Sequence, residues 1–153
     1  MTLKDRFTEG YREYQAELEA SLPRSIAVRR GSNGKLLEKH VEHAGDQLMA
    51  ALGFEIVRLS QSRASRQTPG IPDRKYYHIG HGLTLWWEAK RPGGRQSHCQ
   101  MTFQLMVESC GEYYALGGVD KLHAKLLQIA QQQGLHWKAL QSITITPIGE
   151  SDK

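Results

Sequence analysis

The chain has 153 residues, of which 39% are hydrophobic, which is enough for one ordinary domain with a single buried core. Its 20 basic and 16 acidic residues give a net charge of +4, which excludes a strongly acidic or disordered chain. No apolar run is longer than residues 48–54, whereas a membrane-spanning helix needs about 20 residues. With no basic-then-apolar signal segment and no paired cysteine motif, we expect a soluble protein of the reduced cytoplasm.

The basic excess is concentrated between residues 63 and 95. Seven basic residues lie in this segment against two acidic ones, Asp73 and Glu88, while the rest of the chain is nearly neutral. A local basic surface is typical of proteins that bind nucleic acid. We therefore expect this third of the chain to hold the functional surface.

The N-terminal part of the chain predicts two helices. Apolar residues recur at helical spacing from Leu3 to about Ala20, and again from about Leu36 to Leu52. The stretch between them, Arg24 to Lys35, is polar and predicts a loop or linker. The chain is therefore divided into an N-terminal helix and linker, residues 1–35, and a main domain, residues 36–150.

The rest of the chain predicts strands that alternate with helices. Alternating apolar residues indicate a strand at 54–59, followed by a polar loop. Residues 73–79 and 83–90 are rich in aromatic and aliphatic side chains and flank a glycine-containing turn, which predicts a β-hairpin. The other expected elements are a helix at 97–110, a buried strand at 113–116, a helix at 119–133 and an edge strand at 143–148. We expect an α/β fold with a small mixed sheet flanked by helices.

The register of the hairpin places two acids opposite each other. If Gly80-His81 forms a two-residue type II′ turn with glycine first, Asp73 lies across from Glu88. Directly opposed side chains have Cβ atoms about 5 Å apart, and two carboxylates at that distance repel unless a cation lies between them. Lys90 is two residues beyond Glu88 and projects from the same face. This arrangement favours a divalent-metal site.

These residues resemble a known nuclease signature. Gly70-Ile-Pro-Asp73 followed by Glu88-Ala-Lys90 resembles the motif of the PD-(D/E)XK nucleases, and in its details it is similar to the VRR-NUC branch, the virus-type replication-repair nucleases. Gln100, twelve residues after Glu88, matches a further position of that branch, and Glu38 matches the glutamate of its first core helix. The resemblance covers roughly residues 36–122 and leaves both ends of the chain unexplained.

The resemblance implies a restriction-endonuclease-like core and a Mg²⁺- or Mn²⁺-dependent hydrolase of DNA phosphodiester bonds. Asp73, Glu88, the backbone carbonyl of Ala89 and Glu38 would bind the metal, because hard oxygen ligands suit these ions. Lys90 would position the attacking water or help to deprotonate it. The implied catalytic residues are Asp73, Glu88, Lys90, Glu38 and Gln100. The residues expected to hold backbone phosphates are Arg63, Arg66, Arg74, Arg91 and Arg95.

The resemblance also implies a biological setting. Members of this branch act on branched, flapped or junction DNA, and stand-alone members of this size resemble phage or prophage proteins that often act as homodimers. A dimer suits a two-fold junction substrate. We therefore expect DNA as the partner, a role in phage replication or DNA repair, and a homodimer in the cytoplasm of the bacterial or phage-infected cell.

Some of these residues have a second interpretation. Gln100 fits a capping box with Ser97, in which each side chain satisfies a free amide at the start of a helix. Glu42 lies one turn after Glu38, and the helical wheel favours Glu38 because it lies closer to the apolar arc. Trp87 is expected to pack in the core, on the side of the strand opposite Glu88.

Two other functions stay open. One is a non-catalytic DNA-binding module with a nuclease-like fold, against which the intact set of Asp73, Glu88 and Lys90 argues. The other is a nuclease that acts on RNA or without specificity, which the basic segment would serve equally well. Competition between duplex DNA, branched DNA and RNA separates these functions.

Overall fold

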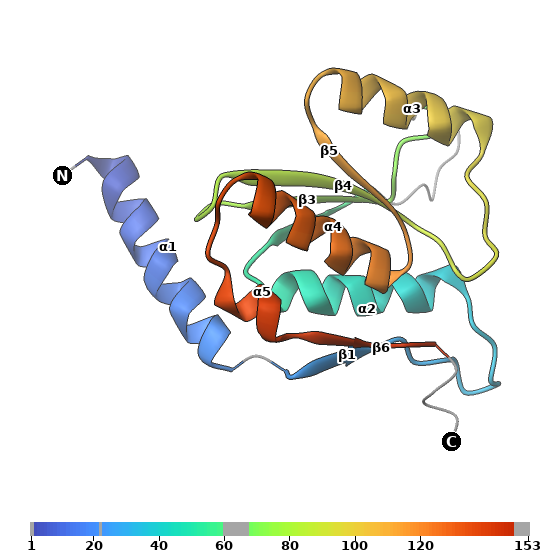
Figure 1. Cartoon of the computed structure of the whole chain (residues 1–153), viewed down its shortest axis with the longest axis horizontal. Helices are drawn as coiled ribbons and strands as arrows, with labels where there is room; N and C mark the ends of the chain where they lie inside the picture. The colour runs from blue at the N-terminus through green and yellow to red at the C-terminus, as the bar shows by residue number, and fades with distance from the viewer. Residues whose placement is uncertain (1, 22, 60–67, 149–153) are drawn as a thin grey trace.

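The structure, a computed structural model, describes residues 2–21, 23–59 and 68–148 (Figure 1). Its largest sheet has the strand order β2-β3-β4-β5. The strands are β2 (Glu55–Arg58), β3 (Arg74–His78), β4 (Leu83–Ala89) and β5 (Tyr113–Gly117). Neighbouring strands are antiparallel from β2 to β4, whereas β5 runs parallel to β4. The expected α/β fold with a small mixed sheet is confirmed.

Helices cover both faces of this sheet (Figure 1). The helices α2 (Glu38–Ala51) and α4 (Val119–Gln132) pack on one face, and α3 (His98–Ser109) packs on the other. Trp87 is fully buried on the α2 face, as expected. A Cβ atom at Gly45 of α2 would lie 2.2 Å from the Trp87 ring, so only glycine at this position lets the helix approach the indole.

The hairpin has the predicted register but a different turn. Arg74 pairs with Trp87, and continuing this register by one residue brings Asp73 opposite Glu88. The residue with positive φ in the turn is Gly82, at 64°, whereas a type II′ turn requires positive φ at Gly80. The last paired residues are His78 and Leu83, and the Gly82 amide donates to the Ile79 carbonyl oxygen at 3.3 Å, so the turn still spans residues 79–82 and the register is the same.

The N-terminal helix forms as predicted and extends away from the rest of the molecule. It is α1 (Leu3–Ala20), and Figure 1 shows it projecting beyond the helices that cover the sheet. The Tyr11 hydroxyl is within hydrogen-bond distance of two acceptors, the Gly53 carbonyl oxygen at 3.3 Å and the Glu55 carboxylate at 3.0 Å. These contacts tie the middle of α1 to the start of β2.

The stretch expected to be a linker contains a strand. The strand β1 (Ser25–Ala27) pairs in parallel with β6 (Thr144–Thr146), which forms the expected edge strand in a separate two-stranded sheet. Ile26 and Val28 belong to the main core, 5% and 7% exposed. The expectation of a loop was wrong at residues 25–27, because the arginines on both sides made this short apolar alternation difficult to recognise. The division at residue 35 stays a prediction, and the core draws residues from both sides of it.

Two further features complete the fold. A short helix, α5 (Lys138–Ser142), precedes β6 and was not anticipated from the sequence. Buried residues of this helix, Ala139 and Leu140, join the main core. None of the described helices has the length and apolar character needed to cross a membrane.

Candidate active site

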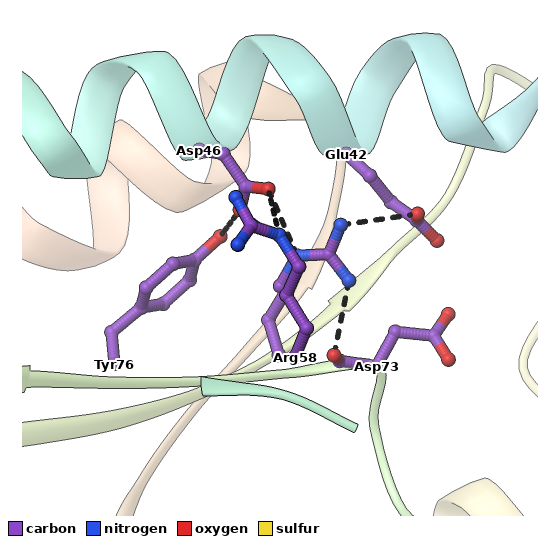
Figure 2. A network of polar contacts seen from close by, with 6 residues as sticks. Glu42, Asp46, Arg58, Asp73 and Tyr76 are labelled. Carbon is purple, nitrogen blue, oxygen red and sulfur yellow. Dashed lines mark hydrogen bonds and ion pairs between the residues drawn. The ribbon is translucent and has the colours of Figure 1, made fainter. Parts of the chain in front are cut away.

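The candidate site lies at the end of the sheet where β3 begins and β4 ends. Because these strands are antiparallel, Asp73, which directly precedes β3, comes close to Glu88 near the end of β4. The helix α2 passes over the same end with its acidic side chains directed at the strands (Figure 2). Three segments that are distant in sequence therefore meet here.

Glu88 is the centre of one group of contacts. Its side chain is 4% exposed, and its Oε1 atom lies 3.2 Å from the Nζ atom of Lys90. The same Nζ atom is 3.6 Å from Oε1 of Glu38, and the Gln100 side-chain amide donates a hydrogen bond of 2.6 Å to Glu88. The structure thus brings together four of the residues predicted to be catalytic.

The surroundings of Glu88 make its carboxyl group hard to ionise. The pKa of Glu88 is raised to about 7, mainly by burial; Lys90 lowers this pKa, and the nearby charges of Asp73 and Glu38 raise it. Glu88 therefore changes its charge near neutral pH, which makes its ionisation sensitive to a cation arriving at the site.

Asp73 and Glu42 form a second pair of acids at this site. Burial raises the pKa of Glu42 to about 7, and a hydrogen bond and charge repulsion from Asp73 add to the effect, while Arg74 opposes it. Two carboxyl groups close enough to share a proton repel each other when both are ionised. The pair is thus a second place at this end of the sheet where negative charge is crowded.

Both glutamates of α2 that the sequence offered as candidates, Glu38 and Glu42, lie at the site. Glu38 contacts Lys90, whereas Glu42 contacts Asp73, so each places a carboxylate at the site. Asp46, which the sequence analysis missed, continues the same row and accepts a hydrogen bond of 2.8 Å from the Tyr76 hydroxyl. The spacing of these acids, four residues apart along one helix face, was the signal that would have found Asp46.

Arg74 is buried and bonded to the acids of the site, and its contact with DNA stays a prediction. Its Nε atom donates to both carboxylate oxygens of Asp46, at 2.9 and 3.1 Å. Its other nitrogens donate to the Asp73 backbone carbonyl at 3.1 Å and to Glu42 at 3.4 Å. The residue is 7% exposed because it lies on the side of β3 that α2 covers. Arg74 therefore holds the acids of the site in place and does not face solvent.

Arg58 is a second arginine on this network that the sequence analysis missed. It pairs with Arg74 across β2 and β3, and its Nε atom lies 3.5 Å from Asp46 (Figure 2). Its side chain is 61% exposed, in contrast to that of Arg74. Arg58 is thus a solvent-facing cation beside Asp46.

The other basic residues of the 63–95 segment are divided between the interior and the surface. Lys75 is 5% exposed, with its Nζ atom 2.9 Å from Glu112 and 4.1 Å from the centre of a Trp86 ring. Arg91 and Arg95 are exposed, and their contact with DNA stays a prediction. Arg63 and Arg66 lie outside the described residues. The charge excess of this segment therefore overstates its basic surface.

Gly70 and the start of α3 explain how Gln100 reaches Glu88. Gly70 has a φ of +83°, and a Cβ atom there would lie 2.2 Å from the Cys99 backbone oxygen, so the Gly-Ile-Pro-Asp segment packs directly on the first turn of α3. Ser97 and Gln100 form the predicted capping box, with bonds of 2.8 and 3.2 Å. The cap and a contact with Glu88 are compatible, because the Gln100 amide oxygen caps the helix while its amide nitrogen donates to Glu88. Its catalytic role stays a prediction.

The donor set suits a hard divalent cation. Asp73 and Glu88 supply carboxylate oxygens, and Ala89 is buried beside Glu88 on the same strand. Burial is the main cause of the raised pKa values of Glu42 and Glu88, and neighbouring carboxylates add a repulsion that a cation would relieve. In residues 2–21, 23–59 and 68–148, no three His, Cys, Asp or Glu side chains are already arranged as a metal-binding group.

Comparisons with known proteins give one similarity. No protein-family model and no curated protein matches the chain. A solved structure described as "VRR_NUC domain" aligns with 56% of this chain and 91% of its own length, at a TM-score of 0.48 and 23% identity. The chain is thus similar in structure to a domain of the same name as the family that its motifs resemble.

Proposed function

We propose that this chain is a metal-dependent nuclease that hydrolyses phosphodiester bonds in DNA. The observation that carries the proposal is the group of contacts around Glu88, in which a buried carboxyl meets Lys90 at 3.2 Å and Gln100 at 2.6 Å. Asp73 lies close enough to raise the pKa of that carboxyl. A buried acid, a lysine and a second acid are the groups that phosphodiester hydrolysis needs to neutralise charge and to activate water.

The metal would be held by Asp73, Glu88 and the backbone carbonyl of Ala89, with Glu38 completing its shell. When bound, Mg²⁺ or Mn²⁺ stabilises negative charge on the phosphate and makes water a better nucleophile. Lys90, positioned between two carboxylates, donates hydrogen bonds that orient the attacking water. Glu42, with a pKa of about 7, is suited to take up the proton that the water releases.

Two residues position the reacting groups. Gln100 fixes one oxygen of Glu88 and is itself fixed by the cap of α3. Arg74 donates to the Asp73 backbone carbonyl and to Glu42, so it holds these two acidic residues in place on the α2 side of the sheet. Rigid support of this kind keeps reacting groups in a productive geometry.

We further propose branched, flapped or junction DNA as the substrate, a homodimer as the active form, and a role in phage replication or DNA repair in the cytoplasm. The resemblance of the sequence motifs supports this substrate, the dimer and this biological role. Arg91 directly follows Lys90, Arg95 comes four residues later, and both are exposed, so they are the described members of the predicted set suited to hold backbone phosphates.

The test is cleavage of labelled duplex, flap, four-way-junction and RNA substrates in Mg²⁺, Mn²⁺ and EDTA. We compare the natural protein with Glu88→Ala and with a matched control, Glu112→Ala, which removes another carboxylate paired with a lysine. We expect metal-dependent cutting of DNA that falls by about 10³-fold or more in Glu88→Ala and stays within about two-fold in the control.

Two results would contradict the proposal. Binding of DNA without cutting in either metal identifies a non-catalytic module. Preferential cutting of RNA identifies a ribonuclease and overturns the DNA assignment, while the role of Glu88 would still be tested by the same variant.

A further inference from the structure

A cationic pocket lies on the side of α2 that faces the segment after β1. Its volume is about 440 Å³, and Arg29, Lys39, His40, His43 and Gln47 contribute to its lining. It is separate from the acidic row of α2, which is directed at the sheet (Figure 2). We name it the α2 pocket.

The lining of the α2 pocket contains cationic and hydrogen-bonding side chains and no acidic residue. Arg29, Lys39 and His43 are exposed. In the part of the chain that the structure describes, neither Arg29 nor Lys39 has a carboxylate within ion-pair distance. A concave site with unneutralised cations attracts an anion.

The walls of the α2 pocket are fixed by packing and hydrogen bonds. The Leu37 backbone amide donates to Nδ1 of His40 at 2.9 Å, so the other ring nitrogen carries a hydrogen and is a donor. A Cβ atom at Gly31 would lie 3.2 Å from the His40 ring, which shows that the 31–35 loop packs directly against this histidine. Ile26 and Val28 are buried in the core and thereby hold Arg29 beside α2.

The α2 pocket begins next to the candidate active site. Lys39 directly follows Glu38, whose carboxylate lies 3.6 Å from Lys90. From Lys39 to Gln47 the helix rises about 12 Å, at about 1.5 Å per residue. A nucleic-acid strand rises about 3.4 Å per nucleotide, so this length corresponds to roughly four nucleotides. A strand held in the pocket can therefore pass the acids at the end of the sheet.

We propose that the α2 pocket binds backbone phosphates of a nucleic-acid strand within a few nucleotides of the bond that is cut. Arg29 supplies a planar pair of donors to phosphate oxygens, and Lys39 supplies a point charge. This inference rests on the proposed function for the cut bond, whereas the binding of phosphates does not depend on it. It also gives a function to the end of β1 and the residues after it, because Ala27 and Arg29 line the pocket.

The test measures binding separately from cutting. Fluorescence anisotropy of a labelled DNA junction in EDTA compares the natural protein with Arg29→Gln/Lys39→Gln over a series of salt concentrations. The matched control is Lys121→Gln/Lys138→Gln, which removes two exposed charges from α4 and α5. We expect the pocket variant to bind about 10-fold more weakly or worse, with a salt slope smaller by about 1 to 2, whereas the control is unchanged.

Equal affinity and salt slope in the pocket variant and the natural protein would overturn the inference. Lys39→Glu is a second test variant, because a charge reversal at this exposed helix position leaves the 29–35 segment unchanged. This variant is expected to weaken binding at least as much as the double variant, and unchanged binding also overturns the inference.

Cleavage assays keep this inference distinct from the proposed function. If the natural protein cuts DNA, the pocket variant is expected to have a raised KM and an unchanged kcat. If the natural protein cuts no nucleic acid but the pocket variant loses binding, the proposed function fails and the pocket inference stands. If the pocket variant binds normally while Glu88→Ala stops cutting, the pocket inference fails and the proposed function stands.

Discussion

Two pairs of a glutamate and a lysine in this protein have nearly the same geometry and opposite electrostatics. Glu88 lies 3.2 Å from Lys90, and Glu112 lies 2.9 Å from Lys75. Burial raises the pKa of Glu88 to about 7, whereas a hydrogen bond from Lys75 holds the pKa of Glu112 below its ordinary value. An ion pair at hydrogen-bond distance therefore does not by itself make a reactive site.

The difference lies in which partner is buried and what surrounds it. The Glu88 side chain is 4% exposed and has other carboxylates near it, whereas the Glu112 side chain is 40% exposed and accepts a further hydrogen bond from Trp86. In the first pair the acid is buried and crowded, and in the second the lysine is buried and the acid is solvated. Crowded buried acids are costly to the fold and are typical of functional sites.

The largest expected effect separates the two lysines by their role. Lys90→Met is expected to lower the cleavage rate by about 10² to 10⁴-fold, because the water loses its orienting donor. Lys75→Met is expected to leave the rate within about two-fold, because Lys75 packs on Trp86 away from the site. The measurement is single-turnover cleavage at saturating enzyme. Equal losses in both variants would show that the two pairs are equivalent.

The next effect tests the packing of Gly70 on α3, which holds Gln100 against Glu88. Gly70 has a positive φ, and Gly70→Ala places a Cβ atom 2.2 Å from the backbone of α3. We therefore expect a loss of stability of about 2 kcal/mol or more. We also expect slower cleavage, because the clash displaces Gln100. Gly82→Ala is the matched control, since Gly82 also has positive φ but no atom within 4 Å of such a Cβ. It is expected to cost about 1 kcal/mol and no activity. Urea unfolding measures both, and equal losses would show that the α3 contact is unimportant.

The pH dependence of stability should have opposite signs for the two glutamates. The pKa of Glu88 is raised by folding, so stability falls as pH rises from about 4.5 to about 7. Glu88→Gln should therefore stabilise the metal-free protein at pH 8 by about 1 to 2 kcal/mol and have little effect at pH 4.

Glu112 should behave in the opposite way. Its pKa is lowered by folding, so its ionised form contributes stability above the ordinary pKa that is lost as pH falls. Glu112→Gln should destabilise the protein slightly at pH 8. Thermal unfolding in EDTA from pH 4 to pH 8 tests both variants, and shifts of the same sign would contradict the comparison.

The smallest expected effect concerns the exposed arginines next to Lys90. Arg91→Gln/Arg95→Gln should weaken DNA binding by about 3- to 10-fold and reduce the salt slope by about 1 to 2, because phosphate contacts are lost. The Lys121→Gln/Lys138→Gln variant controls for net charge. Anisotropy titrations measure the effect, and a loss of equal size in the control would show that only the total charge matters.

Local sequence determined the elements and the pairing of the hairpin. Helical spacing and turn residues act over a few positions, so the helices and the main strands lie close to where they were expected. The register that brings Asp73 to Glu88 depends only on the length of the turn, and the cap of α3 depends on residues three apart. These features come from interactions between near neighbours in the chain.

Tertiary structure decided which charges are buried and which acids meet. Alternation along β3 assigns Arg74 and Lys75 to opposite faces, but only the packing of helices on both faces of the sheet buries them. The contact of Glu42 with Asp73, the place of Asp46 and the pairing of β1 with β6 join segments far apart in sequence. Burial and long-range pairing depend on how the whole chain packs, and no short pattern of residues contains that information.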